Sequence, residues 1–306
     1  MAKTKRALIV INRLARQGDA DLQPVVDTLH GKGIDSILIR IGEADAINVA
    51  IGEYDGRVDR IIIGGGDGTL SASLPSVIQT HLPLGILPLG TANDLARTLK
   101  IPTSLTAAAE IIAAGHIRHI DLGRVNGRYF FNAASIGLAV RVTHSLTHRM
   151  KKKWGVAAYP LALVEAFRAN RPFRARVDCD GKIHRLKSIQ ITIGNGRHYG
   201  GGMAVRQDAQ IDDHRLHCFS LAPQTLWELL KAAPSIFRGT FENRERVWLM
   251  DGSRFEITTR KPKEVDADGE MKAHTPARFS LKKEALPVFV PGEAIGNVSS
   301  KPTIDK

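Results

Sequence analysis

The chain has little of what would place it among secreted, metal-cluster or membrane-spanning proteins. Its 306 residues include two cysteines, Cys179 and Cys218, both in strand-like segments. We expect buried free thiols there, because nothing indicates a disulfide framework or a metal cluster. The apolar run 7–11 is too short for the core of a signal peptide. The longest segment without Asp, Glu, Lys or Arg, residues 68–93, contains three prolines, so no membrane span is expected. These absences predict a cytoplasmic location.

Aromatic residues are also scarce, at 6% of the chain, whereas basic residues are in excess. Lys and Arg number 43 against 31 Asp and Glu, which gives a net charge of +12 and an isoelectric point near 9.9. Such a surface favours an anionic partner: a nucleotide, a nucleic acid or an anionic membrane. The few aromatics and the lack of a recognisable nucleic-acid-binding module argue against nucleic acid.

Short apolar runs alternate with helical spacing through the first part of the chain. We predict buried strands at residues 7–11, 34–41, 61–63 and 84–87, and helices at 21–30, 44–51, 70–79 and 95–100, the third interrupted by Pro75. This alternation predicts a doubly wound parallel sheet, an α/β nucleotide-binding domain over residues 1–129. Ligands of such sheets bind beyond the carboxyl ends of the strands.

The pattern changes after Arg118 to short alternating strands with turn signals. Asn-Gly at 126–127 and Asp-Gly at 180–181 and 251–252 are typical of hairpin turns. We therefore predict an all-β sandwich domain over residues 130–284 that would hold the acceptor substrate. The apolar segment 285–295 is expected to return as a strand to the first domain. The glycine-rich segment 194–203 is predicted to be a loop, with a flexible hairpin as the alternative.

The most informative segment, residues 61–69, reads Ile-Ile-Ile-Gly-Gly-Gly-Asp-Gly-Thr. Glycines allow the backbone to approach a phosphate group, and the N-terminus of a following helix adds partial positive charge. Asp67 would repel a phosphate directly, but it would fit if Mg²⁺ lay between them. The segment thus predicts a nucleotide-phosphate site with Asp67 as a metal ligand. The three glycines alone are equally compatible with a tight structural turn, and the ending of a P-loop is absent.

This string resembles the Gly-Gly-Asp-Gly-Thr signature of diacylglycerol-kinase-type lipid kinases, with sphingosine kinases as relatives and NAD kinases and phosphofructokinases as more distant ones. Residues 88–97, Pro-Leu-Gly-Thr-Ala-Asn-Asp-Leu-Ala-Arg, resemble the second signature of the bacterial lipid kinases, where NAD kinases differ. A simpler interpretation, in which Asn93 or Asp94 only caps a helix, is compatible with this one. The resemblance covers about residues 5–289 and implies ATP and Mg²⁺ as cofactors. The nucleotide-binding residues it implies are Asn12, Arg13, Arg40, Gly65, Gly66, Asp67, Gly68, Thr69, Thr91, Asn93 and Asp94.

A third motif, Asp268-Gly269-Glu270, would be a hairpin turn if it stood alone. Its position matches the Asp-Gly-Glu of the same family. A lipid hydroxyl that attacks the γ-phosphate must lose its proton, and a carboxylate within hydrogen-bond reach can accept it. By this resemblance Glu270 is the base, and Asp268 orients it or holds Mg²⁺ through water.

Related kinases also carry an Asp-Gly turn that holds a structural Mg²⁺ with the Asp and two backbone carbonyls. The matching set here is Asp213 with the carbonyls of Gln210 and Arg215, although His214 replaces the glycine. A solvated turn is the alternative.

The resemblance implies an ATP-dependent kinase of a lipid hydroxyl, with diacylglycerol as the leading acceptor. The basic run 149–154, Arg-Met-Lys-Lys-Lys-Trp, is predicted to dock on an anionic membrane surface, which would make the association peripheral. A solvated helix face is the alternative. Two other functions stay open: a kinase of a soluble hydroxyl such as NAD, and a non-catalytic basic protein that binds nucleotides or nucleic acid. A homodimer is also left open.

Overall fold

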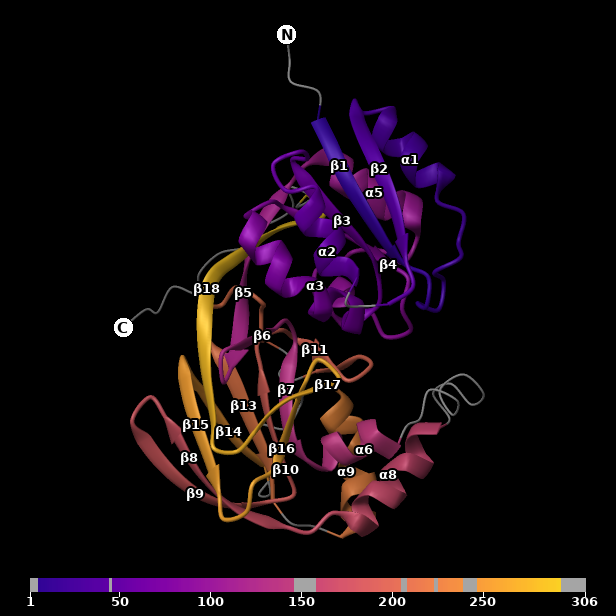
Figure 1. Ribbon diagram of the computed structural model, residues 1–306. Coiled ribbons are helices and arrows are strands. Elements are labelled where there is room, and N and C mark those ends of the chain that lie inside the picture. Colours follow the sequence, from indigo (N-terminus) through magenta and orange to yellow (C-terminus); the bar gives the residue numbers. More distant parts are fainter. Residues whose placement is uncertain are drawn as a thin grey trace, which may run out of the picture.

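The computed structural model of the chain describes residues 5–43, 46–145, 158–204, 208–222, 225–238 and 247–292. The basic run 149–154 lies outside the described residues. Figure 1 shows an N-terminal α/β unit above a strand-rich unit, with one long strand running along both. No helix within the described ranges is long and apolar enough to cross a membrane.

Four parallel strands form the centre of the N-terminal unit, in the spatial order β2-β1-β3-β4. In β1, β3 and β4 the apolar residues, mostly β-branched or Leu, are buried, as in parallel sheets covered on both faces, whereas Leu38 of the edge strand β2 is 40% exposed. The predicted doubly wound fold is thereby confirmed. The strands are β1 (Lys5–Asn12), β2 (Ile34–Ile41), β3 (Arg60–Gly65) and β4 (Leu84–Pro88), and the helices are α1 (Gln23–His30), α2 (Ala46–Glu53), α3 (Asp67–Thr80), α4 (Asp94–Thr98) and α5 (Leu105–Ala114).

The helix α3 continues through Pro75, so the predicted interruption is wrong. Proline in a helix interior costs roughly 3 kcal/mol, because a hydrogen bond is lost and the ring crowds the preceding turn. Here the ring is exposed, while Leu70, Leu74 and Val77 are buried at the spacing of one helix face. Burial of that face against the sheet outweighs the local cost.

The strand-rich unit is a sandwich of two sheets. The ten-stranded sheet continues from β4 into β18 (Ala277–Phe289), β15 (Arg254–Thr259), β8 (Phe173–Cys179) and β9 (Lys182–Ser188), with β5 (Ile117–Val125) paired to β18 and β6 (Arg128–Phe130) to β5. The six-stranded sheet has the order β14 (Val247–Gly252), β13 (Leu216–Leu221), β10 (Gln190–Gly194), β7 (Ala133–Gly137), β16 (Glu264–Ala267) and β17 (Glu270–His274). Phe255 and Phe279 from one sheet pack in the same core as Ile136 and Ile191 from the other. The predicted β-sandwich is therefore present.

The strand β18 joins the two units. Its residue Phe279 pairs with Phe255 within the sandwich, and Val288 pairs in parallel with Leu84 of the N-terminal sheet. The segment 285–295, expected to return to the first unit, forms the end of this strand as far as it is described. One hydrogen-bonded sheet thus spans both units (Figure 1).

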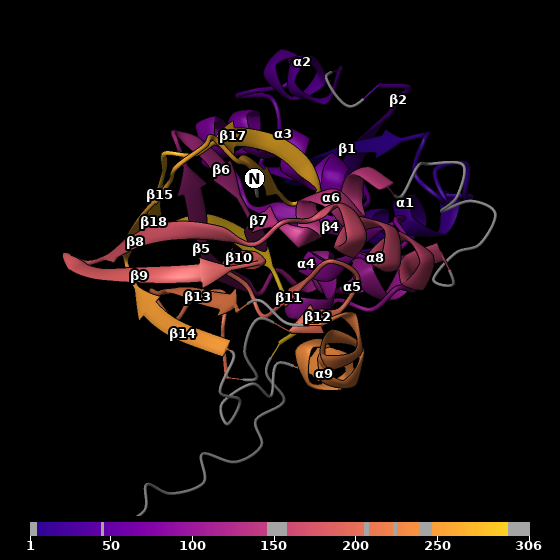
Figure 2. The ribbon, with the colours of Figure 1, turned by 90° about the horizontal axis from the view of Figure 1, so that it is seen from below.

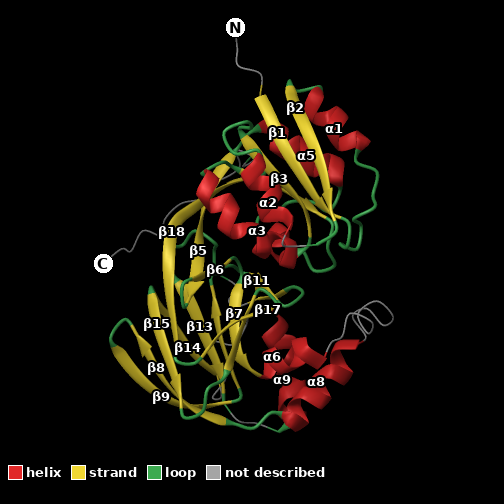
Figure 3. Ribbon diagram, viewed as in Figure 1, coloured by secondary structure: helices red, strands yellow, loops and turns green. Residues whose placement is uncertain are grey.

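The second unit is not all-β. Figure 3 shows helices α6 (Leu138–Ser145), α8 (Ala158–Ala169) and α9 (Leu226–Arg238) in it, and Figure 2 shows them gathered beside the strands. The turn at 251–252 is also not a hairpin turn, because β14 and β15 belong to different sheets. Within the glycine-rich segment 194–203, β11 (His198–Tyr199) pairs with β12 (Met203–Ala204) around three glycines with positive φ, Gly200–Gly202. That segment is a small hairpin and not a plain loop.

Candidate active site

The end of β1 is tied to the start of α3. The Asn12 side-chain amide donates a hydrogen bond of 2.9 Å to Thr69 Oγ1. Between them runs Gly65, where an added Cβ would lie 2.5 Å from the Thr69 side chain. The glycine at position 65 is therefore required by packing. The backbone N–H groups in the first turn of α3 have no acceptors within the helix, because they lie at its N-terminus. Such N–H groups are suited to bind an anion.

The loop after β4 closes directly on the glycine loop. The Leu89 N–H donates to the Gly65 carbonyl at 3.0 Å, and a Cβ on Gly90 would lie 2.4 Å from Gly66 Cα. Asn93, in the left-handed conformation with φ 49°, holds this loop because its side chain both donates to and accepts from the Gly90 backbone. The two signatures identified in the sequence thus form one surface.

Asp67 links that surface to α4. Its Oδ1 accepts a hydrogen bond of 3.1 Å from the Leu95 N–H, in the first turn of α4. Among the described residues its Oδ2 has no hydrogen-bond partner, so this oxygen is available to a metal or to water. Asp67 therefore both caps a helix and carries a charge beside the glycine loop.

Asp94, at the start of α4, is 4% exposed. Its Oδ2 accepts from the Gly201 N–H at 2.8 Å, whereas its buried Oδ1 has no partner among the described residues. Burial, and then the negative charge of Asp67, raise the pKa of the Asp94 carboxyl to about 6, against the lowering effect of nearby N–H groups and Arg97. An orphaned buried oxygen next to a second carboxylate fits a site that takes up a cation.

Asp268 approaches the same place from the second unit. It lies in the turn between β16 and β17, with φ 52°, and its carboxylate accepts hydrogen bonds from the backbone N–H groups of Phe131 at 2.7 Å and Asn132 at 2.9 Å. Burial raises the pKa of the Asp268 carboxyl to about 6, with a further contribution from the charge of Asp67, although the two N–H donors oppose the shift. Residues 67, 94 and 268 therefore share one electrostatic environment.

Glu270 begins β17 and is exposed. The Asp268 carboxylate hydrogen-bonds to the backbone of residues 131–133 and not to Glu270. If Asp268 orients Glu270, it does so indirectly, through the turn that joins them.

The other predicted nucleotide residues lie at the same edge of the parallel sheet but differ in their contacts. The guanidinium of Arg40 donates to the carbonyls of Gly18 at 2.8 Å and Ala20 at 3.1 Å, so it shapes the loop after β1. Arg13 is exposed and lies 3.7 Å from Asp19. Gly68 and Thr91 are exposed. The sequence did not predict the role of Gly201, although three consecutive glycines were the signal for a close backbone contact.

A catalytic Mg²⁺ fits this site. Mg²⁺ at nucleotide sites is commonly held by one or two carboxylates together with phosphates and waters. Asp67 and Asp94 offer such oxygens. No three His, Cys, Asp or Glu side chains of the described ranges form a complete metal cluster, so phosphate oxygens would have to complete the coordination.

The predicted structural Mg²⁺ site does not fit its donor set. Asp213 Oδ1 accepts from the Arg215 N–H at 3.0 Å, and Oδ2 accepts from the Gln210 N–H at 3.1 Å and lies 2.7 Å from His217 Nε2. Burial lowers the pKa of His217, but hydrogen bonds and charges from Asp213 and Asp251 outweigh it and raise the pKa to about 9. A cationic side chain already lies beside the carboxylate that was expected to hold the metal.

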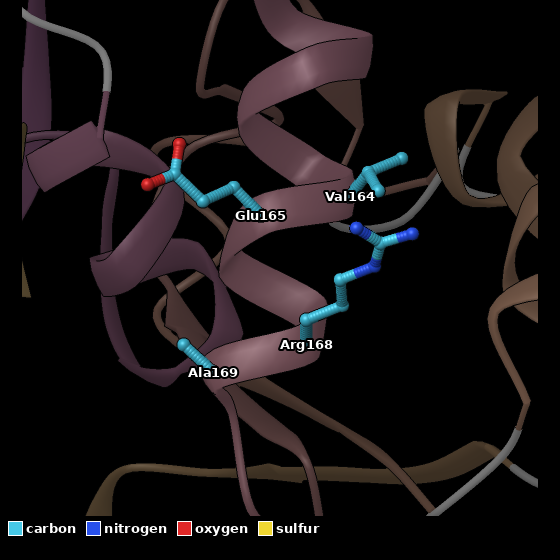
Figure 4. Close-up of a pocket in the computed structure, with 4 residues that line it drawn as sticks. All are labelled: Val164, Glu165, Arg168 and Ala169. Atoms are coloured by element: carbon cyan, nitrogen blue, oxygen red, sulfur yellow. The ribbon is translucent and has the colours of Figure 1, made fainter.

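An open pocket lies elsewhere, along α8. Figure 4 shows Glu165 extending to one side of this helix and Val164 and Arg168 to the other. Its lining contains none of the carboxylates described above, so it is distinct from the candidate active site.

A glycine-rich turn that carries a carboxylate, with a further carboxylate from a second unit, is an arrangement suited to phosphoryl transfer. Comparison with known proteins agrees. The family described as the diacylglycerol kinase catalytic domain matches residues 6–125, and the YegS C-terminal NAD kinase beta sandwich-like domain matches residues 132–290. The chain belongs to this diacylglycerol kinase and YegS-like family of lipid kinases, and it is a phosphotransferase with an alcohol group as acceptor.

Individual relatives support this assignment at modest identity. The chain is 26% identical over 251 residues to "Diacylglycerol kinase" of Staphylococcus saprophyticus, covering 81% of this chain and 82% of that one. It is 29% identical over 298 residues to "Probable lipid kinase YegS-like" of Klebsiella pneumoniae, covering 95% and 98%. A crystal structure of a diacylglycerol kinase from Bacillus anthracis str. Sterne shares the fold with a TM-score of 0.76 at 23% identity, covering 96% of this chain and all of that one. Another solved chain from that strain has a TM-score of 0.81 at 27% identity, covering 94% and 98%. The non-catalytic alternative is thereby excluded.

Proposed function

We propose that this chain transfers the γ-phosphate of ATP, in the presence of Mg²⁺, to the hydroxyl of diacylglycerol and so forms phosphatidic acid. One observation carries the proposal: Asp67 of the glycine loop accepts from the Leu95 N–H in α4, and Asp94 of the same helix accepts from the Gly201 N–H of the second unit. This supports a site between the glycine loop and the second unit. An acceptor hydroxyl held there would lie between a γ-phosphate and a proton acceptor.

The roles of the residues follow from their contacts. The N–H groups at the start of α3 and the turn 65–68 bind the phosphates, and Asp67 and Asp94 hold the cation that accompanies them. Mg²⁺, when bound, offsets the negative charge of the phosphates. Asp268 has both oxygens engaged with the 131–133 backbone, so we assign it a positioning role. Glu270, two residues later, accepts the proton of the acceptor hydroxyl.

Diacylglycerol lies in a membrane, and the chain must reach it there. The net charge of +12 favours an anionic surface. The run 149–154 places four basic residues beside Trp154, and each basic residue near an anionic leaflet contributes about 1 kcal/mol. We therefore propose peripheral membrane association through this segment.

The test is acceptor labelling. The purified chain is incubated with γ-labelled ATP, Mg²⁺ and vesicles of total lipid extract, with NAD supplied in a parallel reaction. The proposal expects the label in phosphatidic acid, and only when vesicles are present. Label in NAD, or in a soluble product independent of vesicles, would contradict it.

A further inference from the structure

The side chain of His217 bridges two carboxylates. Its Nε2 lies 2.7 Å from Asp213 Oδ2 and its Nδ1 lies 2.9 Å from Asp251 Oδ1. His217 and Asp251 are cross-strand partners on β13 and β14, and His217 is 5% exposed. Ionised carboxylates only accept hydrogen bonds, so the ring donates from both nitrogens.

His214 makes the second connection, in the turn before β13. It has φ 62°, a conformation that favours glycine, and its N–H donates to Asp121 Oδ2 at 2.9 Å. The ring Nδ1 lies 3.1 Å from the same oxygen. The Asp121 carboxylate, 1% exposed, also accepts from the Glu284 N–H of β18 at 2.7 Å. The histidine thereby connects the turn to β5 and β18.

These contacts replace the ones that a divalent cation would make. Such a cation would need the Asp213 oxygens and the carbonyls of Gln210 and Arg215. Instead, the N–H groups of Gln210 and Arg215 point at the carboxylate, and His217 occupies its remaining side. The donor set is that of an anion bound by N–H groups and not that of a metal.

We propose that the side chains of His214 and His217 take the place of a structural cation at this turn, so that the second unit folds without a bound divalent ion. His217 holds the turn to β14, and His214 holds it to β5 and β18. An ion would make both connections by coordination; here they are made by directional hydrogen bonds to the carboxylates of Asp213 and Asp251 and to the buried carboxylate of Asp121.

Hydrogen bonds connect Asp121, the partner of His214, to the turn that carries Asp268. The Asn195 amide donates to the carbonyls of Asp121 at 2.9 Å and Phe131 at 2.8 Å. Phe131 in turn donates its N–H to Asp268. His214, through Asp121 and Asn195, therefore helps to position Phe131, whose N–H holds the Asp268 carboxylate.

Thermal unfolding of the full chain tests the inference without nucleotide or lipid, and so independently of the proposed reaction. The Tm is measured in MgCl₂ and in EDTA for the wild type, Asp213→Asn and Asp67→Asn. We expect the wild-type Tm to agree between the two buffers within about 1 °C, or to show a Mg²⁺-dependent rise that Asp67→Asn removes, because that ion binds in the cleft. A rise that persists in Asp67→Asn and disappears in Asp213→Asn would overturn the proposal.

A second pair of variants tests the histidine itself. His217→Ala removes the imidazole that lies between Asp213 and Asp251 and so brings two negative charges together without the cation that offset them, and we expect the Tm to fall by roughly 5–10 °C in both buffers. His119→Ala, an exposed histidine of β5, is the matched control and should stay within about 1 °C of the wild type. If His217→Ala does not fold, His217→Gln, which keeps one donor, should show an intermediate loss. Wild-type stability in His217→Ala or in His217→Gln would overturn the proposal.

Discussion

The backbone N–H of Gly201 donates a hydrogen bond of 2.8 Å to Oδ2 of Asp94. This bond joins the β11–β12 hairpin of the second unit to the first turn of α4 in the first. The Thr98 hydroxyl, one turn further along α4, accepts from the His198 N–H at 3.3 Å. The two halves of the cleft are thus held together at α4, next to the glycine loop.

The close approach of Gly66 and Gly90 should make the second signature intolerant of a methyl group. In Gly90→Ala the new Cβ would meet the Gly66 backbone at 2.4 Å, so the loops must separate. We expect a loss of roughly 1–3 kcal/mol in stability and weaker ATP binding. Gly52→Ala, in α2 with open space around it, is the control and should be neutral or stabilising. Unfolding and ATP titration of both variants measure this. Wild-type ATP affinity in Gly90→Ala would contradict the predicted contact.

Substitution of the two carboxylates of the Asp-Gly-Glu motif should have different consequences. Glu270→Gln keeps the size of the side chain but cannot accept a proton, so kcat should fall by about 10²–10⁴ with little change in ATP affinity or Tm. Asp268→Asn weakens the hold on the 131–133 backbone, so we expect a lower Tm together with lower activity. If Glu270→Gln lost ATP binding instead, Glu270 would be a nucleotide ligand.

Much of this site could be predicted from the sequence, and some of it could not. The apolar runs before Gly64 and Pro88 predict two strands, and their carboxyl ends lie at the same edge of the parallel sheet, which brings the two signatures together. The bonds from Gly201 to Asp94 and from Phe131 to Asp268 join residues more than 100 positions apart, through a hairpin and a turn that no local pattern defines. The predicted interruption of α3 at Pro75 was wrong because burial of the opposite helix face outweighs the local cost of the proline.

The turn at Asp213 shows a different limit. The Asp-Gly motif of the related kinases predicted a role for Asp213 and showed that His214 replaces the glycine. His217 lies outside that motif, so the motif does not indicate a role for it. Its role depends on Asp251 across the sheet, which only the register of β13 and β14 reveals.

Activity should fall on the acid side well before the chain unfolds. The pKa values of Asp94 and Asp268 are raised to about 6, so below that pH both carboxyls take up protons: Asp94 loses the charge that serves the cation, and Asp268 loses the charge that accepts from the 131–133 backbone. The sign for stability is opposite. A folded pKa above the ordinary 3.8 means that the folded chain binds the proton more tightly, so these groups cost stability above pH 6 and that cost disappears as the pH falls towards 4.

We therefore expect kcat/KM to decline from pH 7 to pH 5 while protonation of these two groups raises the Tm. Asp94→Asn, which is uncharged at every pH, should be slow throughout and lose part of this dependence. Parallel rate and unfolding measurements decide the matter: an activity profile that follows the Tm would show that acid acts on the fold.

Membrane docking should depend on where the positive charge lies. Replacement of Lys151, Lys152 and Lys153 by Gln should weaken binding to anionic vesicles, most strongly at low salt where charges are least screened. Activity on a short-chain, dispersed diacylglycerol should be largely spared. The matched control removes equal charge from exposed positions of β9, at Lys182, Arg185 and Lys187. Equal losses of vesicle binding in the two triple variants would mean that only the net charge matters.

The most direct test of the account concerns Asp67. Asn at this position keeps an oxygen for the Leu95 N–H, so Asp67→Asn should fold with the wild-type Tm while it loses the charge that serves the cation. We measure transfer of labelled phosphate from ATP to diacylglycerol in mixed vesicles by both proteins. We expect a loss of about a hundredfold or more in Asp67→Asn. A folded Asp67→Asn protein that phosphorylates diacylglycerol at the wild-type rate would contradict it.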